Sequence, residues 1–227
     1  MVLYELQDRL DLKVVPRLIL CFDVSHHQGT DVVGSAVAFE SGEPKKADYR
    51  HMKVRGQWGN DDVRSMEEVV RRTLAGRQEE GRPLPELVVV DGGSGQLAAA
   101  GRALESLGLE DITVIGLAKR EETVHRQGGD PPLRLTADDP TLHLLQRIRD
   151  EAHRFAHSYN RKLRTRRTVR SALSEIPGIG PTRQKRLLDR FGSVRAIQRA
   201  SPEEISRVPG VSLPLAQRIL TYLGRKG

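Results

Sequence analysis

Residues Leu87–Leu117, LVVVDGGSGQLAAAGRALESLGLEDITVIGL, decide the fold class of this 227-residue chain. The segment opens with a short apolar run, Leu87–Val90, which predicts a buried strand that ends at Asp91-Gly-Gly. Gln96–Leu107 has the pattern of a helix, and Ile112–Leu117 predicts a second strand. A strand, a helix and a strand in this order normally place the two strands side by side and parallel, with a right-handed crossover. The segment therefore predicts a sheet that is at least partly parallel.

Strands and helices on either side of this segment complete the predicted domain. The breaks between the first three strands are short and rich in turn residues, which favours antiparallel neighbours. We predict a mixed α/β fold with a five-stranded sheet and helices on its faces. The further strands are Arg17–Ser25, Val32–Phe39 and Ala47–Val54, with a short one at Leu133–Leu135, and the further helices are residues 1–15 up to Pro16, Asp62–Ala75 and Thr141–Asn160.

Composition excludes several classes of protein. At about 150 residues per domain, the length fits one full domain and a smaller one. Hydrophobic residues make up 37% and charged residues 30% of the chain, and the mean hydropathy is −0.47. No apolar run approaches the roughly 20 residues of a membrane-spanning helix, and no signal-peptide pattern opens the chain. Cys21 is the single cysteine, which excludes an internal disulfide and a cysteine-rich zinc module, so we expect a reducing, cytoplasmic compartment.

The charge is divided unevenly along the chain. Residues 1–160 hold 21 Lys and Arg against 26 Asp and Glu, whereas residues 161–227 hold 16 against 4. This asymmetry favours a polyanionic partner bound mainly by the C-terminal part, although a merely solvated basic surface is the alternative. Six of the ten residues in Arg161–Arg170 are cationic, which indicates an exposed linker or a phosphate-facing helix extension. We therefore predict domains at 1–160 and 171–227, joined by the basic segment 161–170.

An internal repeat marks the C-terminal part. Ile176–Gly180 reads IPGIG, the later segment Val208–Ser212 reads VPGVS, and helical patterns flank both copies. Glycine permits positive φ and a close backbone approach, and the amides at the start of the following helix attract anions. Two such hairpins can hold phosphates without reading bases. The alternative is a small helical bundle whose helices end in Pro-Gly turns.

Fourteen residues are the candidates for contact with nucleic acid. Arg183 and Lys185, with Arg186, follow the first hairpin and add positive charge, whereas Ser212 stands where glycine is usual and predicts a weaker second hairpin. Lys119 and Arg120, after the fifth strand, are either phosphate contacts or solvated loop charges. The candidates are Ile176, Pro177, Gly178, Ile179, Gly180, Arg183, Lys185, Val208, Pro209, Gly210, Val211, Ser212, Lys119 and Arg120.

Two aspartates lie at or near the ends of predicted strands of the larger domain. Asp23 lies near the end of the first strand and Asp91 at the end of the fourth, where α/β proteins usually bind ligands. If these strands are neighbours, the carboxylates converge, and such a pair is tolerated mainly around a cation such as Mg²⁺ or Mn²⁺. Alternatively, Asp91 could cap the helix that starts near Ser94. The segment is not a Walker loop, because no Gly-Lys-Ser/Thr follows.

Two histidines share one face of the predicted helix Thr141–Asn160. His153 and His157 are four residues apart, and Asp150 lies three residues before His153. A zinc-protease motif is excluded, because the HRFAH sequence lacks the glutamate that follows the first histidine of that motif. Taken alone, an exposed helical histidine is more often inert than a ligand.

These segments together carry a resemblance to a known family. From about residue 17 to its end, the chain resembles the C-terminal half of UvrC, the endonuclease subunit of bacterial nucleotide excision repair. The matching segments, in order, are Cys21–His26 (CFDVSH), Gly59–Asp62 (GNDD), Leu87–Leu97 (LVVVDGGSGQL), Leu117–Glu122 (LAKREE) and Leu145–Phe155 (LQRIRDEAHRF), followed by the two hairpins.

The resemblance implies a fold, a site and an activity. It implies an RNase H-like domain with adjacent first and fourth strands, followed by a small all-α tandem helix-hairpin-helix domain. Asp23, Asp91 and His153 take the place of the family's Asp-Asp-His metal site for Mg²⁺ or Mn²⁺, and Asp62 matches a further acidic catalytic position. The implied activity is metal-dependent incision of DNA on the 5′ side of a lesion, which leaves a 3′-hydroxyl and a 5′-phosphate. The implied partners are damaged double-stranded DNA and the UvrB–DNA complex.

No segment of the chain matches the family's N-terminal nuclease domain or its UvrB-binding segment. We therefore expect a fragment or a short form that does not make both incisions alone.

Two alternative functions share this fold. One alternative is a non-catalytic DNA-binding module on an inactive RNase H-like scaffold, and the other is a junction-resolving nuclease. The intact acidic and histidine positions disfavour the first, and the tandem hairpins after the helix with His153 favour repair.

Overall fold

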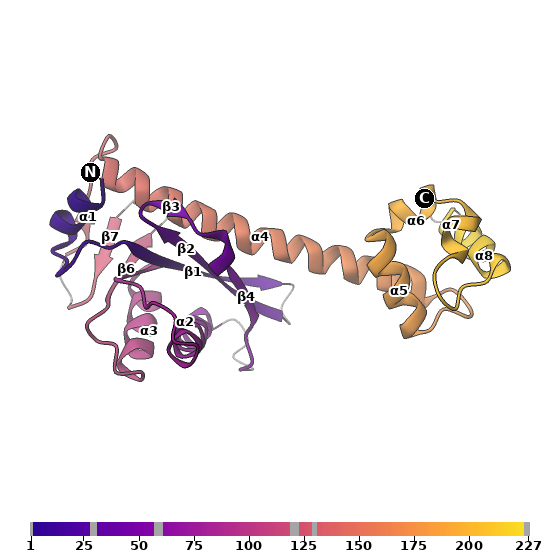
Figure 1. The fold of residues 1–227 in the computed structure, drawn as a ribbon, viewed down its shortest axis with the longest axis horizontal. Helices are drawn as coiled ribbons and strands as arrows, with labels where there is room; N and C mark the ends of the chain where they lie inside the picture. The colour runs from indigo at the N-terminus through magenta and orange to yellow at the C-terminus, as the bar shows by residue number, and fades with distance from the viewer. Residues whose placement is uncertain (1, 28–30, 57–60, 119–122, 129–130, 225–227) are drawn as a thin grey trace. The chain divides into compact units, whose positions relative to one another are not determined.

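The computed structural model describes residues 2–27, 31–56, 61–118, 123–128 and 131–224, without the side chains of residues 26, 27, 31 and 160–171. The chain forms two compact units, Met1–Ser158 and Tyr159–Gly227. The first contains a sheet with helices, and the second contains helices alone (Figure 1). Among the described residues, no helix is long and apolar enough to cross a membrane.

The sheet of the first unit is mixed, as the sequence predicts. The strand order is β3-β2-β1-β5-β6-β7-β8, with β4 also paired to β2. The pairs β1–β5 and β5–β6 are parallel, whereas the other pairs are antiparallel. The strands are β1 (Leu18–His27), β2 (Asp31–Glu40), β3 (Glu43–Pro44), β4 (Arg50–Lys53), β5 (Leu87–Asp91), β6 (Thr113–Ala118), β7 (Thr123–Arg126) and β8 (Leu133–Arg134).

The five predicted main strands are β1, β2, β4, β5 and β6, and three short strands extend the sheet. Residues Leu133–Arg134 form β8, close to the short strand predicted at Leu133–Leu135. β3 and β7 are not predicted, because strands of two and four residues are too short to show an alternating pattern. The third predicted strand is too long at its start, since residues Lys46–Asp48 form a 3₁₀ turn before β4.

Alternating side chains of the central strands divide the core into two layers. Phe22 and Val90 pack with α2 (Asp62–Glu79) and α3 (Ser94–Glu105), whereas Cys21 and Val89 pack with α1 (Val2–Leu10) and α4 (Pro140–Ser174). Figure 1 shows α2 and α3 on one side of the sheet and α4 on the other. Residues at the same level on β1 and β5 therefore face the same helix layer.

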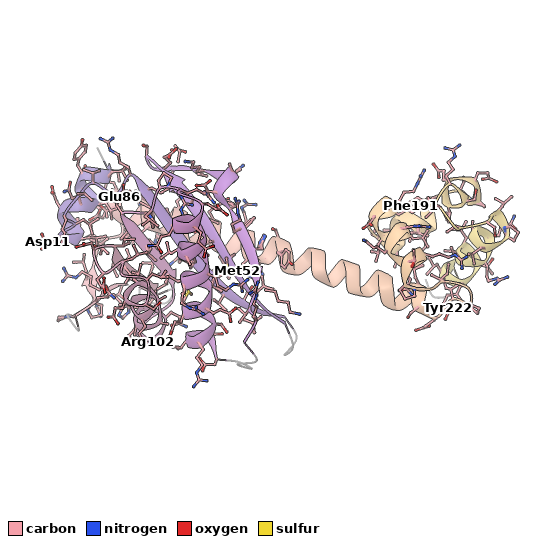
Figure 2. All side chains as sticks on the ribbon, turned by 60° about the horizontal axis from the view of Figure 1, so that its bottom comes forward. Asp11, Met52, Glu86, Arg102, Phe191 and Tyr222 are labelled. Atoms are coloured by element: carbon pink, nitrogen blue, oxygen red, sulfur yellow. The ribbon has the colours of Figure 1, made fainter. Side chains whose placement is uncertain are left out.

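Helix α2 lies unusually close to the sheet at one glycine. A Cβ atom built on Gly34 of β2 would lie 2.2 Å from Val69 Cγ2, so only a residue without a side chain fits there. Met52 of β4, labelled in Figure 2, packs against the same layer and accepts a hydrogen bond at Sδ from Thr73 Oγ1 at 3.8 Å. These contacts fix the β2–β4 edge against α2.

Helix α4 is longer than the periodic pattern predicts. Thr141–Asn160 is the predicted helix, but α4 continues to Ser174 through the basic segment 161–170. That segment contains no glycine or proline to stop a helix, and its arginines are good helix formers. The backbone of the basic segment is thus helical.

The second unit is a small helical bundle. Its helices after α4 are α5 (Pro181–Phe191), α6 (Val194–Arg199), α7 (Pro202–Ser206) and α8 (Leu213–Gly224), which enclose a core of their own. Phe191 and Tyr222, labelled in Figure 2, pack at the edge of this core, and the Tyr222 hydroxyl donates to Glu175 Oε2 at 2.7 Å. α6 is not predicted, because six residues show less than two turns of periodicity.

Candidate active site and nucleic-acid interface

The two aspartates lie level with each other on adjacent strands, where the parallel pairing of β1 and β5 ends. Asp91 is the last residue of β5, whereas β1 continues to His27, so Asp23 lies inside its strand and not near its end as predicted. Phe22 of β1 pairs with Val90 of β5 in the parallel register, and Asp23 and Asp91 are the next residues of those strands. Because side chains alternate along a strand, both carboxylates face the α4 layer. The Asp23 side chain is 7% exposed and the Asp91 side chain 2% exposed. The register thus brings two buried carboxylates together.

Helix α4 places an imidazole over this pair. Ile148 and Ala152 are fully buried against the sheet, and His153 follows Ala152 at the edge of the buried face. His153 Nδ1 lies 3.5 Å from Asp23 Oδ2 and 3.7 Å from Asp91 Oδ2. One ligand atom from each of the three residues lies within 4.8 Å of the other two. The His153 side chain is 42% exposed, so solvent can reach the site.

The donor set fits a divalent cation. Two buried carboxylates this close repel each other unless a positive charge lies near them. Carboxylate oxygens are preferred ligands of Mg²⁺ and Mn²⁺, and an imidazole nitrogen is a common ligand of other first-row divalent ions. Asp23, Asp91 and His153 could therefore hold such an ion.

The negative charge of the two carboxylates affects the buried thiol of Cys21. Burial raises the pKa of the Cys21 thiol well above its usual range, and the negative charges of Asp91 and Asp23 raise it further. The positive charge of Arg149 lowers the pKa of Cys21, so this guanidinium lies within electrostatic reach of the Cys21 thiol. The Arg149 side chain is only 10% exposed. It is not among the site residues predicted from the sequence, although its spacing of four residues places it on the His153 face of α4.

The second histidine of α4 contacts the first. His157 Nε2 and His153 Nε2 are 2.8 Å apart, a hydrogen bond in which one ring donates to the other. His153 thus presents Nδ1 to the carboxylates and Nε2 to His157. Asp150, which shares the predicted face, is 67% exposed and accepts hydrogen bonds from Arg149 instead. The structure therefore brings His157, but not Asp150, to His153.

The turn after Asp91 is shaped by close packing and not by capping through its carboxylate. Gly93 is the N-cap of α3, so the capping alternative for Asp91 is wrong. A Cβ atom on Gly116 of β6 would lie 2.8 Å from Gly92 O, which shows how closely the turn lies on the neighbouring strand. This packing holds the end of β5 in place.

The other predicted catalytic and basic residues of the first unit are not part of this three-residue cluster or lie outside the described residues. Asp61 caps α2 by accepting a hydrogen bond from the Arg64 amide at 3.0 Å, and Asp62 is the first residue of the helix. Asp62 is half-buried and is not one of the three groups that converge. Lys119 and Arg120 lie outside the described residues.

Both hairpins of the second unit are type II turns. Gly178 has φ +90° and Gly210 has φ +84°, at the turn position that requires positive φ. The amide of Ile179 donates to Ile176 O, and that of Val211 donates to Val208 O, each at 3.0 Å. The flanking apolar residues are buried, whereas the Pro-Gly tips are exposed. The α5 and α8 helices begin directly after the turns, as the repeat predicts.

Arg183 lies between the two turns. Its Nε donates to Gly210 O at 2.6 Å, and its Nη1 donates to Gly178 O at 2.7 Å. Lys185, also predicted to meet phosphate, is exposed on α5. Arg183, which the sequence predicts to contact DNA, therefore donates hydrogen bonds to a backbone carbonyl of each hairpin.

Both units are similar to known protein families. The family model described as "UvrC RNAse H endonuclease domain" matches residues 7–157, and that described as "SAM-like Helix-hairpin-helix tandem" matches residues 171–225. The UvrABC system protein C of Gemmatimonas aurantiaca is 51% identical over 221 residues, and that of Gloeobacter violaceus is 50% identical over 225 residues. In each case the alignment covers 97% of this chain and 36% of the relative. The chain thus spans about a third of the length of these curated relatives.

Solved structures give more distant similarities. Human ENDOV is similar with a TM-score of 0.39 and 13% identity, over 70% of this chain and 95% of that one. XPF from Aeropyrum pernix is similar with a TM-score of 0.26 and 21% identity, over 67% of this chain and 74% of that one.

Proposed function

The chain belongs to the UvrC family, as its motifs predict, and from this membership we propose that it is a metal-dependent DNA endonuclease of bacterial nucleotide excision repair. The proposed reaction is the incision on the 5′ side of a lesion. The observation that carries the proposal is the convergence of Asp23, Asp91 and His153 within 4.8 Å, where the central strands β1 and β5 meet α4.

Each residue of the cluster has a proposed role. Asp23, Asp91 and His153 would hold Mg²⁺ or Mn²⁺, a kind of ion that acidifies water and stabilises charge on a phosphoryl oxygen when bound. His157 accepts or donates at His153 Nε2 and so restrains the imidazole ring. The Arg149 guanidinium offsets the negative charge of the two carboxylates. Asp62, at the start of α2, is proposed as a further catalytic residue.

The proposed chemistry is hydrolysis of a phosphodiester. The oxygen of water forms a bond to phosphorus and the bond to the 3′-oxygen breaks, which leaves a 3′-hydroxyl and a 5′-phosphate. The two carboxylates, the imidazole and the nearby guanidinium are fixed by β1, β5 and α4 before any substrate arrives. Such preorganised charge is the main means by which enzymes stabilise phosphoryl transfer.

The second unit is proposed to hold the DNA duplex. The two Pro-Gly turns, residues 176–180 and 208–212, would contact phosphates without reading bases. We propose that residues 1–160 carry the chemistry, that residues 171–227 bind DNA and that the basic segment 161–170 joins them. Lys119 and Arg120 are proposed as further phosphate contacts. In the full-length context the proposed partner is the UvrB–DNA complex, and the proposed compartment is the cytoplasm.

An Asp23→Asn variant separates catalysis from binding. We expect loss of nicking on lesion-containing duplex DNA in Mn²⁺, with the Kd for the same DNA nearly unchanged, because the turns lie elsewhere. Asp111→Asn is the matched control, since Asp111 is a fully exposed aspartate paired with Lys13. Equal losses of nicking and of DNA affinity in Asp23→Asn would indicate a structural aspartate. A wild-type chain that binds DNA but never nicks it would favour the non-catalytic module.

A further inference from the structure

The two hairpin repeats exchange arginine contacts. Arg186 of the first repeat donates through Nη1 to Pro209 O of the second turn at 2.8 Å. Arg218 of the second repeat donates through Nη1 to Pro177 O of the first turn at 3.3 Å. Arg186 and Arg218 occupy equivalent positions of the internal repeat, and so do Pro177 and Pro209, so the two bonds are equivalent as well. Each turn is therefore held by the helix that follows the other turn.

The glycines of the turns show how closely these side chains lie on the backbone. A Cβ atom on Gly210 would lie 3.4 Å from Arg186 Nη1, and one on Gly178 would lie 4.0 Å from Arg218 Nη1. Arg183 breaks the symmetry, since Leu215 stands at the equivalent position of the second repeat. Its single guanidinium donates to a carbonyl of each turn. Three arginines thus join the two turns to each other.

The arginines act on a part of the turns that the core does not hold. Ile176, Ile179, Val208 and Val211 are buried and anchor the bases of the turns. The tips, Pro177-Gly178 and Pro209-Gly210, are exposed. Their carbonyls accept the charge-assisted bonds from Arg183, Arg186 and Arg218, and bonds of this kind are stronger and more directional than neutral ones. A planar guanidinium fits such a role, whereas a lysine amine carries the charge without the fork.

We propose that Arg186 and Arg218, together with Arg183, are positioning residues that fix the separation of the two turn tips, so that both tips contact phosphates of one duplex at once. The proposal rests on the proposed DNA-binding role of the hairpins. Two sites on a rigid frame bind one ligand far more tightly than either site alone, and the gain is lost when their geometry is no longer fixed.

The test uses the full chain with both arginines replaced, Arg186→Ala with Arg218→Ala. Arg195→Ala with Arg199→Ala is the control, because it removes equal charge from exposed positions of α6. Fluorescence anisotropy gives Kd for a long duplex and for a stem-loop too short for both turns to contact. We expect a loss of at least tenfold on the long duplex relative to the control, with equal affinities of the two proteins for the stem-loop. Arg186→Lys with Arg218→Lys should restore little of the loss.

Three results would overturn the proposal. The first is a double variant, Arg186→Ala with Arg218→Ala, that matches the control on the long duplex. The second is an equal loss of affinity for both DNAs in a folded protein, and the third is full restoration of the affinity by the two lysines. Thermal unfolding shows whether the double variant folds. If it does not fold, the single Arg218→Ala variant is measured in the same way against Arg199→Ala. A wild-type chain that binds neither DNA contradicts the proposed DNA grip itself, which is a separate outcome.

Discussion

Replacing Asp91 with asparagine should stabilise the metal-free protein. The Asp91 and Asp23 side chains are nearly buried, and their ligand oxygens lie within 4.8 Å of each other. Two unit charges at that distance repel by about 3 kcal/mol at an effective dielectric constant of about 20. The positive charge of the Arg149 guanidinium, which acts on the same buried thiol as the two carboxylates, offsets part of this repulsion. Because asparagine keeps the shape and removes the charge, we expect a gain of about 1–2 kcal/mol in the free energy of unfolding.

The assay is thermal unfolding in a chelator and in Mn²⁺. A change of 1 kcal/mol shifts the Tm by about 2–4 °C in a domain of this size. We expect the Tm of Asp91→Asn in chelator to exceed that of the wild type by several degrees. The wild type should gain stability on adding Mn²⁺, because an ion that binds only the folded state stabilises it, whereas the variant should gain little. Asp111→Asn, at an exposed site, should behave like the wild type.

The opposite pattern would refute this reasoning. If Asp91→Asn unfolds at a lower temperature than the wild type in chelator, the carboxylate stabilises the fold through its own contacts. If the variant and the wild type respond equally to Mn²⁺, Asp91 does not hold the ion. The first result would remove the repulsion between the carboxylates from which the metal site is inferred, and the second would remove Asp91 from that site.

Three further predictions concern packing, the second histidine and the thiol. Gly34→Ala should lower the free energy of unfolding by about 1–3 kcal/mol in urea titrations, since the new methyl group would overlap Val69; an unchanged midpoint would contradict the close packing of α2. His157→Ala should weaken Mn²⁺ binding roughly tenfold in calorimetry without changing the Tm in chelator, because the contact with His157 restrains the His153 ring. An unchanged affinity would show that this contact does not contribute to metal binding. Cys21 should resist thiol reagents in the native protein, because it is buried and its pKa is raised, and it should react with them after the protein is unfolded in denaturant. Fast labelling of the native protein would show that the thiol lies at the surface.

Much of the fold follows from short-range patterns in the sequence. The apolar run at Leu87–Val90 and the helix and strand after it predict the parallel pair β5–β6 correctly, because the crossover rule leaves few alternatives. The predicted positions of Asp23 and Asp91, near the end and at the end of their strands, imply that the two converge if β1 and β5 are neighbours, which is the observed order. They converge although β1 continues past Asp23 to His27, because the β1–β5 pairing ends just before both residues. The adjacency itself comes from the family resemblance and not from the pattern.

Other features depend on contacts that no local pattern encodes. β7 is a strand because β6 offers an edge to four residues, and α6 is a single short helix capped by Ser193. Arg149 is nearly buried, and its charge acts on the same core thiol as the charges of Asp23 and Asp91, which no local pattern predicts. The guanidinium of Arg183 is placed by carbonyls in two turns that are distant from each other in the sequence. From the sequence alone, a basic residue after a hairpin could contact a DNA phosphate or hold a backbone carbonyl of the other turn. The sequence therefore does not distinguish these two roles for Arg183.

We propose that Asp23, Asp91 and His153 share one divalent cation. The decisive experiment is a crystal of the chain soaked in Mn²⁺, with data collected for anomalous scattering. We expect one strong anomalous peak in contact with both carboxylates and with His153 Nδ1. A crystal that shows Mn²⁺ elsewhere and no peak among these three groups would contradict it.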